Sequence, residues 1–262
     1  MGDTSYSCTV HGGDGRPGLG SHGNGHVGIP LLSALNPSRI ANTLLGWAGL
    51  RVVRAPPSVW PIGTAARGVA TLIDVGCAYG TPQFYGVNDE ARLFLIDPVE
   101  EYTPHIRAVL RRRAGGYAIT AVGARRGEVL MNVEAVDPEK SSILARTDLT
   151  ATGGRLDRRR VPVTPLDSIV AQHGLQPPFG IKIDTEGYEM EVVRGASETL
   201  SRTSFLIAEV SVQERFEGGY RLIEFLDQMR AHGFEAGNVL SARPDRRGLV
   251  RFMDMLFVRP SA

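Results

Sequence analysis

The sequence predicts an α/β fold, a doubly wound and mainly parallel seven-stranded sheet with helices on both faces, over residues 68–262. Two observations predict it. From about Gly68 onward, short apolar runs alternate with longer helical stretches, which is the pattern of successive βα units. A glycine turn follows the first run and acidic residues follow later ones, at the sheet edge where open parallel sheets bind ligands.

The apolar runs define the expected strands, and the stretches between some of them show helical spacing. Helices are expected over residues 99–112, about 188–200 and 221–232, the last one closed by Gly233. The fourth and fifth strands look like an inserted or edge region. The expected strands are residues 69–75, 92–96, 117–122, 128–134, 160–164, 180–184, 204–210, 235–240 and 252–258.

The first 67 residues differ in composition from the rest. Residues 1–28 contain nine glycines, which are costly to order and bury little, so we expect a flexible tail or a lid over a substrate. Residues 29–67 combine an N-terminal helical segment, with apolar spacing between 38 and 54, and a linker containing three prolines.

Composition narrows the classes of partner. With 29 basic and 28 acidic side chains, the chain gives no electrostatic reason to expect nucleic acid. It has no run of about 18 apolar residues, so no membrane span is expected. Cys8 and Cys77 lack metal-ligand spacing, and no basic patch precedes an apolar leader, so we expect a cytoplasmic protein. A homodimer is compatible with these features.

A glycine turn follows the first expected strand, with the sequence Asp74-Val75-Gly76-Cys77-Ala78-Tyr79-Gly80. Gly76 would let the backbone turn sharply and approach a ligand, and Gly80 would relieve crowding at the next helix. The G-x-x-x-G spacing differs from that of dinucleotide and phosphate-binding loops. The turn therefore favours a nucleoside cofactor without phosphates, although a turn that serves packing alone would explain it too.

Asp97 ends the second expected strand, 21 positions after Gly76. A carboxylate there can accept hydrogen bonds from both ribose hydroxyls. The alternative is an acid that caps the next helix, with Pro98 at its first position. Together with the glycine turn, Asp97 favours a cofactor that carries a ribose.

A third segment, residues 180–196, runs from a buried strand through a cluster of acids into a helix. It resembles the signature of the FkbM-type methyltransferase family, K-x-D-x-E-G-x-E-x-x-x-x-x-G-A. The family often has glutamate where this chain has Asp97, and both are carboxylates. The matching residues are Lys182, Asp184, Glu186, Gly187, Glu189, Gly195 and Ala196, and further likeness lies at Ala121-Val122-Gly123, Ser141-Ser142 and Val163-Thr164-Pro165-Leu166-Asp167-Ser168.

The resemblance implies a Rossmann-like methyltransferase that uses S-adenosylmethionine (SAM). It also implies an acceptor hydroxyl on a sugar, glycoside or polyketide-type natural product, either a small molecule or an oligosaccharide. We expect Ser141, Ser142 and Glu186 to contact this acceptor. The expected cofactor-binding residues are Asp74, Gly76, Cys77, Tyr79, Gly80, Asp97, Pro98, Ala121 and Val122.

Three carboxylates are the expected catalytic residues, because an alcohol must lose its proton to accept a methyl group. Asp184 and Glu186 follow the strand at 180–184, and Glu209 ends the next strand. One of them serves as a general base, or Asp184 and Glu209 hold a Mg²⁺ ion, which prefers oxygen ligands. His105 is an alternative base.

Several alternatives compete with these roles. Glu189 favours a structural role at a helix N-terminus, and Lys182 in a buried strand is expected to pair with an acid. A nicotinamide-dependent oxidoreductase could use the same turn and Asp97. A non-catalytic methyltransferase-like interaction module is the other alternative, although the three acids expected of an enzyme are present.

Overall fold

The computed structural model describes residues 62–134, 141–147 and 156–260. Residues 1–61, and with them the predicted tail or lid and the predicted helical segment, lie outside the described residues. So do Cys8 and the prolines of the predicted linker.

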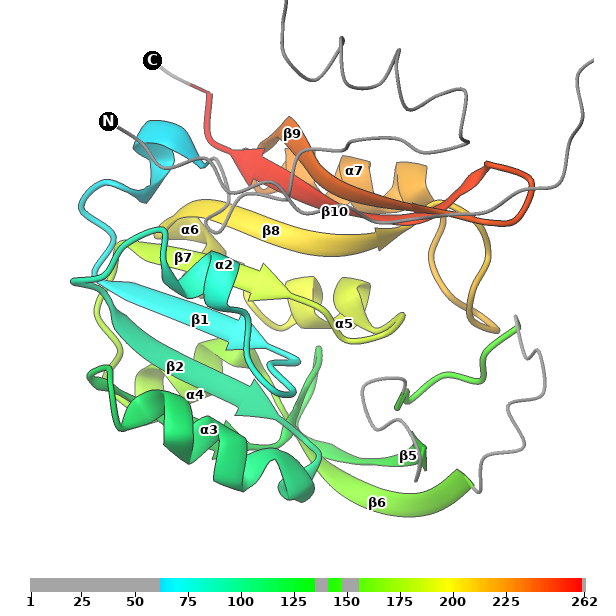
Figure 1. Ribbon diagram of the computed structural model, residues 1–262, viewed down its shortest axis with the longest axis horizontal. Coiled ribbons are helices and arrows are strands. Elements are labelled where there is room, and N and C mark those ends of the chain that lie inside the picture. Colours follow the sequence, from blue (N-terminus) through cyan, green and yellow to red (C-terminus); the bar gives the residue numbers. More distant parts are fainter. Residues whose placement is uncertain (1–61, 135–140, 148–155, 261–262) are drawn as a thin grey trace, which may run out of the picture. The chain divides into compact units, whose positions relative to one another are not determined.

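One seven-stranded sheet organises the described residues, in the order β3-β2-β1-β7-β8-β10-β9 (Figure 1). Its five strands from β3 to β8 are parallel, and β10 runs antiparallel to both of its neighbours. This arrangement confirms the predicted doubly wound, mainly parallel sheet. The strands are β1 (Thr71–Val75), β2 (Arg92–Asp97), β3 (Gly115–Ile119), β7 (Phe179–Ile183), β8 (Thr203–Ser211), β9 (Glu235–Pro244) and β10 (Val250–Val258).

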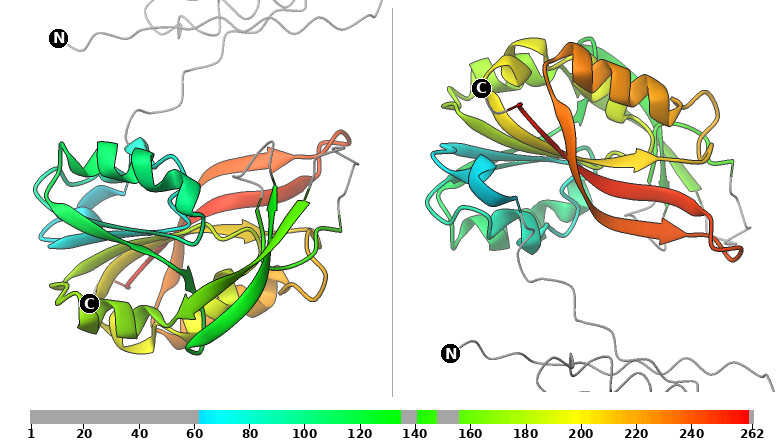
Figure 2. Two further views of the ribbon diagram at one scale, coloured as in Figure 1. Left: turned by 90° about the horizontal axis from the view of Figure 1, so that it is seen from below. Right: turned by 90° about the horizontal axis from the view of Figure 1, so that it is seen from above.

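Helices cover both faces of this sheet (Figure 2). The helices η1, α2, η2 and α3 pack with one buried cluster, and α4, α5, α6 and α7 pack with the other. The helices are η1 (Gly63–Ala66), α2 (Pro82–Tyr85), η2 (Glu100–Tyr102), α3 (Thr103–Leu110), α4 (Leu166–Gln172), α5 (Glu189–Arg194), α6 (Ser197–Ser201) and α7 (Leu222–Ala231).

The two buried clusters follow from the alternation of side chains along each strand. On β1, Leu72 belongs to the cluster under α3, and its neighbour Ile73 belongs to the cluster under α4 to α7. All five residues of β1 are buried, as are all five of β7. Central strands covered on both faces read as continuous apolar runs, which explains why the sequence located them well.

A second, three-stranded sheet has the order β4-β6-β5, formed by Ala121–Val122, Leu156–Thr164 and Gly127–Glu134. Its two long strands confirm the predicted inserted or edge region. The single strand predicted over residues 117–122 is wrong in one respect, because Thr120 separates β3 from β4 and the chain changes sheets there. The Thr120 hydroxyl donates a hydrogen bond to the carbonyl of Pro162 at 3.0 Å, which fixes the crossing.

The predicted helix over residues 188–200 is two helices, α5 and α6, separated at Gly195. A Cβ at Gly195 would lie 2.1 Å from the carbonyl oxygen of Gly123, so the chain packs directly on another backbone segment. Helices α2 and α4 were not predicted, because their four and seven residues are too few for a clear helical period.

Residues 62–67, predicted to be part of the linker, contain η1. Ile62 and Ala66 are buried in the cluster that includes α3. Within the described ranges, no helix is long and apolar enough to cross a membrane.

Candidate active site

A pocket of about 360 Å³ opens at the carboxyl ends of β1, β2 and β7. From β1 the chain adds β2 and β3 on one side of the sheet and later adds β7 and β8 on the other side. The order of strands therefore reverses at β1, and ligands bind at such switch points. Asp74 and Ser142 are predicted site residues outside its lining. The predicted site residues that line it are Gly76, Cys77, Tyr79, Gly80, Asp97, Pro98, Ala121, Val122, Ser141, Asp184, Glu186 and Glu209.

Gly76 occupies the junction between the ends of β1 and β7. Its φ is +78°, and a Cβ there would lie 1.8 Å from the carbonyl oxygen of Asp184. The amide of Asp184 in turn donates to the carbonyl of Val75 at 2.9 Å. Gly76 was expected to let the backbone approach a ligand. In the structure, the absence of a Cβ also lets the end of β7 pack against it.

Asp97 is fixed at the edge of the pocket by two backbone amides. Its Oδ2 accepts from the amide of Ala78 and its Oδ1 from the amide of Val99, each at 2.9 Å. Burial raises the pKa of this carboxyl to about 7. Since each carboxylate oxygen can accept more than one hydrogen bond, both remain able to accept from a ribose diol.

Two further predicted residues of the glycine turn differ in exposure. Tyr79 is half exposed at the rim, with its ring edge-on to Tyr102 at 4.9 Å and to His105 at 4.7 Å. His105 does not line the pocket, which weakens it as an alternative base. Cys77 is buried, and burial raises the pKa of its thiol, so it lines the pocket as a small neutral side chain.

Lys182 pairs with acids, as the sequence predicted. Its Nζ lies 3.0 Å from Asp184 Oδ2 and 3.8 Å from Asp74 Oδ1. Asp74 is fully buried behind the pocket, where its Oδ2 accepts from the Tyr85 hydroxyl at 2.7 Å. Asp74 therefore does not face the pocket but helps to hold Lys182, and Lys182 in turn fixes one oxygen of Asp184.

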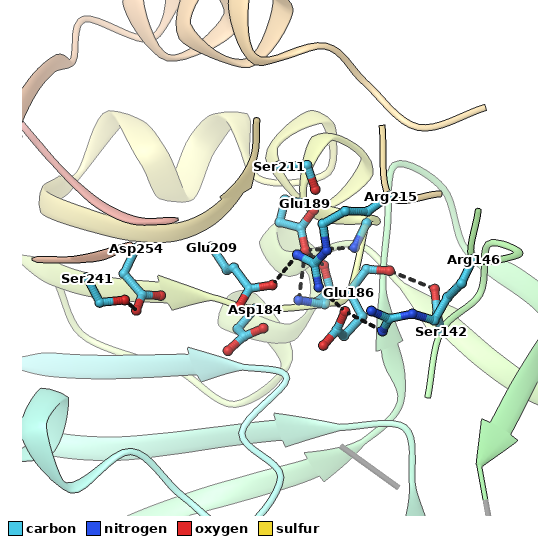
Figure 3. Close-up of polar contacts among 12 residues, drawn as sticks. Ser142, Arg146, Asp184, Glu186, Glu189, Glu209, Ser211, Arg215, Ser241 and Asp254 are labelled. Carbon is cyan, nitrogen blue, oxygen red and sulfur yellow. Dashed lines mark hydrogen bonds and ion pairs between the residues drawn. The ribbon is translucent and has the colours of Figure 1, made fainter. Parts of the chain in front are cut away.

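Glu186 and Glu209 share one guanidinium (Figure 3). Arg215 donates from Nη1 to Glu209 Oε1 at 2.6 Å and from Nη2 to Glu186 Oε2 at 2.7 Å. Arg146 also donates to Glu186 Oε2, at 3.0 Å. Burial raises the pKa of both glutamates, to about 7 for Glu186 and about 9 for Glu209.

The turn that carries Glu186 is built by Glu189. The buried Oε1 of Glu189 accepts from the amides of Thr185 and Gly187, each at 3.0 Å, and its Oε2 accepts from the Tyr220 hydroxyl at 2.9 Å. Glu186 adopts a φ of +51° in this turn. These contacts support the structural role predicted for Glu189.

The two serines of the predicted pair Ser141-Ser142 make different contacts. Ser141 lines the pocket, whereas the Ser142 hydroxyl donates to the backbone carbonyl of Glu186 at 2.6 Å. The amide and carbonyl of Ser142 pair with Asn132 of β5 at 3.0 and 2.9 Å. Ser142 thus attaches the second sheet to the acid-bearing turn, and the predicted contact of Ser142 with the acceptor finds no support in the pocket lining.

Four residues of this site were not predicted from the sequence, namely Arg215, Arg243, Phe252 and Asp254. Arg215 lies in a segment without a motif, so no sequence signal could have placed it. Arg243 and Phe252, from β9 and β10, form part of the pocket wall together with Asp254. Asp254 stands opposite Glu209 in the register of β10 and β8, which only the sheet order reveals.

The carboxylates do not fit the Mg²⁺ alternative. Asp184 and Glu209 each contact a cationic side chain, Lys182 or Arg215, at 3.0 Å or less. A divalent cation at these oxygens would face both positive charges. Across the described part of the chain, no group of three or more His, Cys, Asp or Glu side chains is arranged to hold a metal ion.

Comparisons with known proteins identify a family for this chain. Residues 74–236 match the family model of the methyltransferase FkbM domain. The chain is 25% identical over 172 residues to the 2-O-methyltransferase NoeI of Sinorhizobium fredii. The aligned region covers 60% of this chain and 69% of that protein.

Two solved structures are also similar. One is magnesium protoporphyrin IX methyltransferase from Synechocystis PCC 6803 with bound SAM, with a TM-score of 0.40, 10% identity and coverage of 85% of this chain and 79% of that one. The other is precorrin-6y C5,15-methyltransferase from Geobacter metallireducens, with a TM-score of 0.42, 10% identity and coverage of 76% and 85%.

The family match covers more than half of the chain and includes the glycine turn, Asp97, the three carboxylates and Arg215. The chain belongs to the FkbM family of methyltransferases.

Proposed function

We propose that this protein is a SAM-dependent O-methyltransferase that acts on a hydroxyl of a sugar, glycoside or polyketide-type natural product. The observation that carries this proposal is the Asp184 carboxylate at the pocket. Lys182 holds its Oδ2, while Oδ1 has no hydrogen bond to any described residue. The name of the relative NoeI, a 2-O-methyltransferase, supports oxygen as the acceptor atom.

The pocket suits the nucleoside part of SAM. Asp97 offers two fixed carboxylate oxygens to the ribose, and Tyr79 and Val99 stand beside them in the lining. The volume of about 360 Å³ falls within the range of small-molecule sites. When bound, SAM supplies an activated methyl group on a sulfonium, and the nearby carboxylates favour that positive charge.

Asp184 is the proposed general base. Its side chain is 31% exposed, against 12% for Glu209 and 17% for Glu186, so an acceptor hydroxyl can reach it most easily. As the new carbon–oxygen bond forms, the hydroxyl proton passes to Asp184 Oδ1 and the electron pair of the broken carbon–sulfur bond stays on sulfur. Alignment of the acceptor accounts for much of the rate, and a positioned base adds roughly 10²–10⁴-fold.

The acceptor is proposed to lie between two walls of the same pocket. Ser141 and Ile143 form one wall, and Arg243 and Phe252 form the other. Hydroxyl groups of a sugar would find acceptors in the carboxylates and donors in Ser141 and Arg243, while Phe252 offers an apolar surface. This mixture of groups fits a polyhydroxylated small molecule or the end of an oligosaccharide.

The substitution Asp184→Asn tests the proposal. We expect methyl transfer from labelled SAM to a panel of glycosides and macrolides to fall roughly 10²–10⁴-fold, the usual contribution of a general base. Binding of S-adenosylhomocysteine (SAH), measured by calorimetry, should stay close to that of the unchanged protein.

The matched control is Asp245→Asn, which removes a carboxylate that binds Arg247 outside the pocket. This variant should turn over normally. Near-normal turnover of Asp184→Asn would remove Asp184 from the catalytic step. Tight binding of NAD without binding of SAH would instead favour an oxidoreductase.

A further inference from the structure

Arg215 is a buried cation that none of the predicted roles includes. It lies after β8, is 3% exposed, and contacts both Glu186 and Glu209. Its guanidinium lies over the ring of Phe252, 3.9 Å from the ring centroid, and 5.1 Å from that of Phe216. Two aromatic rings and two carboxylates therefore hold this side chain in one place.

The backbone around Arg215 is fastened to the segment that carries Ser141, which we call the strap and define as residues 141–147. The amide of Thr147 donates to the carbonyl of Arg215, and the amide of Glu217 donates to the carbonyl of Ala145, each at 2.8 Å. The strap also supplies Arg146, which binds the same oxygen of Glu186 as Arg215 does. Arg215 is thus the point where the strap, the acid-bearing turn and β8 meet.

The positive charge of Arg215 offsets repulsion among the carboxylates of the pocket. Glu186, Glu209 and Asp184 gather in one pocket, and each carboxylate disfavours ionisation of its neighbours. A guanidinium shared by two of them offsets that repulsion. Without it, both glutamates would keep their protons to higher pH, and the pocket would offer less negative charge to the methyl donor.

Other charged groups face the same pair from four directions. Lys182 lies in β7 and Asp184 directly follows it, Glu189 lies in α5, and Arg146 lies in the strap. Asp254 of β10 stands opposite Glu209, and its Oδ2 accepts from Ser241 at 2.5 Å. Of these groups and Arg215, only Arg215 contacts both glutamates in the described structure.

We propose that Arg215 is a positioning residue of the methyl-transfer reaction, which holds Glu186 and Glu209 at the acceptor pocket beside Asp184 and makes both easier to ionise. The inference rests on the proposed function. It assigns no contact between Arg215 and the methyl donor, so its loss should affect turnover and not donor binding.

The test compares Arg215→Gln and Arg215→Lys with a charge-matched control. Arg159→Gln serves as the control, because Arg159 of β6 pairs with Glu101 of η2 and with Asp157 of its own strand and does not line the pocket. For Arg215→Gln we expect kcat to fall about 100-fold, as for loss of a base, with unchanged SAH affinity. The acid limb of kcat/KM should move to higher pH by about one unit or more, because the glutamates keep their protons longer.

Arg215→Lys keeps the charge but cannot bind both carboxylates as a fork, so it should recover part of kcat and part of the pH shift. Arg159→Gln should behave as the unchanged protein. If Arg215→Gln fails to fold, two other variants are compared with the unchanged protein. One is Arg215→Lys. The other combines Arg215→Gln with Glu209→Gln, which removes one of the carboxylates left unpaired.

A second readout requires no acceptor. The protein labelled with ¹³C at the glutamate carboxyls is titrated by NMR, with Glu186→Gln and Glu209→Gln to assign the two signals. Removal of Arg215 should move both titrations to higher pH, and the Arg159 control should move neither. Unmoved titrations and an unmoved acid limb would overturn the role of Arg215. If the unchanged protein transfers no methyl group to any hydroxyl acceptor, the proposed function fails, and the titration still decides whether Arg215 sets the charge of the pair.

Discussion

At the scale of single residues, Asp97 links cofactor binding to pH. Burial raises its pKa to about 7, while two backbone amides bind the ionised form. A ribose diol donates hydrogen bonds, so it favours the ionised carboxylate. We expect SAH affinity to rise as pH increases from 6 to 8, by up to about tenfold per pH unit below the pKa. Calorimetric titration across this range measures the effect.

Asp97→Asn provides the comparison, because the amide has no charge to titrate. It should bind SAH more weakly and with little dependence on pH, while Asp245→Asn should keep the slope of the unchanged protein. A slope that persists in Asp97→Asn would assign the pH dependence to another group.

Metal removal is a second prediction that belongs to individual side chains. Since Lys182 and Arg215 already neutralise Asp184 and Glu209, we expect EDTA to leave the methyl-transfer rate unchanged. The measurement is the initial rate after dialysis against EDTA, with Mg²⁺ added back to a parallel sample. A loss that Mg²⁺ restores would revive the metal alternative.

At the scale of elements, the ends of β1 and β7 depend on Gly76. The substitution Gly76→Ala places a Cβ 1.8 Å from the carbonyl oxygen of Asp184, at a φ of +78°. Backbone strain and overpacking together should cost about 2–5 kcal/mol of the free energy of unfolding. Urea denaturation followed by circular dichroism measures this change.

Gly127→Ala is the matched control, because a Cβ at Gly127 would meet no atom within 4 Å. It should change the free energy of unfolding by less than about 0.5 kcal/mol, as is usual for a surface substitution. Equal effects of the two substitutions would contradict the close approach of the two strand ends.

The boundaries of the elements show which ones local sequence patterns can predict and which ones they cannot. The central strands were located to within two residues, because strands covered on both faces are continuously apolar. The break between α5 and α6 could not be read from the sequence, since it depends on Gly123, about seventy positions away. The separation of β4 from β3 likewise depends on β6, with which β4 pairs.

At the scale of the whole molecule, the buried acids predict an unusual dependence of stability on pH. Burial raises the pKa of Asp97 and Glu186 to about 7 and of Glu209 to about 9, above their usual values of 3.8 and 4.5. The folded protein therefore binds more protons than the unfolded chain between about pH 5 and 8. By linkage, the free energy of unfolding decreases as pH rises through that window.

We expect the protein to be more stable at pH 5.5 than at pH 8.5, by at least about 1.4 kcal/mol, the equivalent of one pKa unit. Urea denaturation midpoints at several pH values measure this difference. Saturating SAH should reduce the slope, because it favours ionised Asp97. A midpoint that rises with pH would contradict the assignment of buried, protonated carboxyl groups.

The sequence by itself determined the fold class, the glycine turn, Asp97 and the three carboxylates, because these features follow from local patterns. Apolar runs report burial, and residues directly after parallel strands must meet at one edge of the sheet. The K-x-D-x-E-G segment then indicated the family.

Only the tertiary structure decided which groups surround those acids. It placed Asp74 behind the pocket with Lys182, and it brought Arg146 and Arg215 onto Glu186 from two segments that share no motif. The reason is physical, because the charge state of a buried carboxylate depends on its neighbours in space, and sheet order and loop packing choose those neighbours.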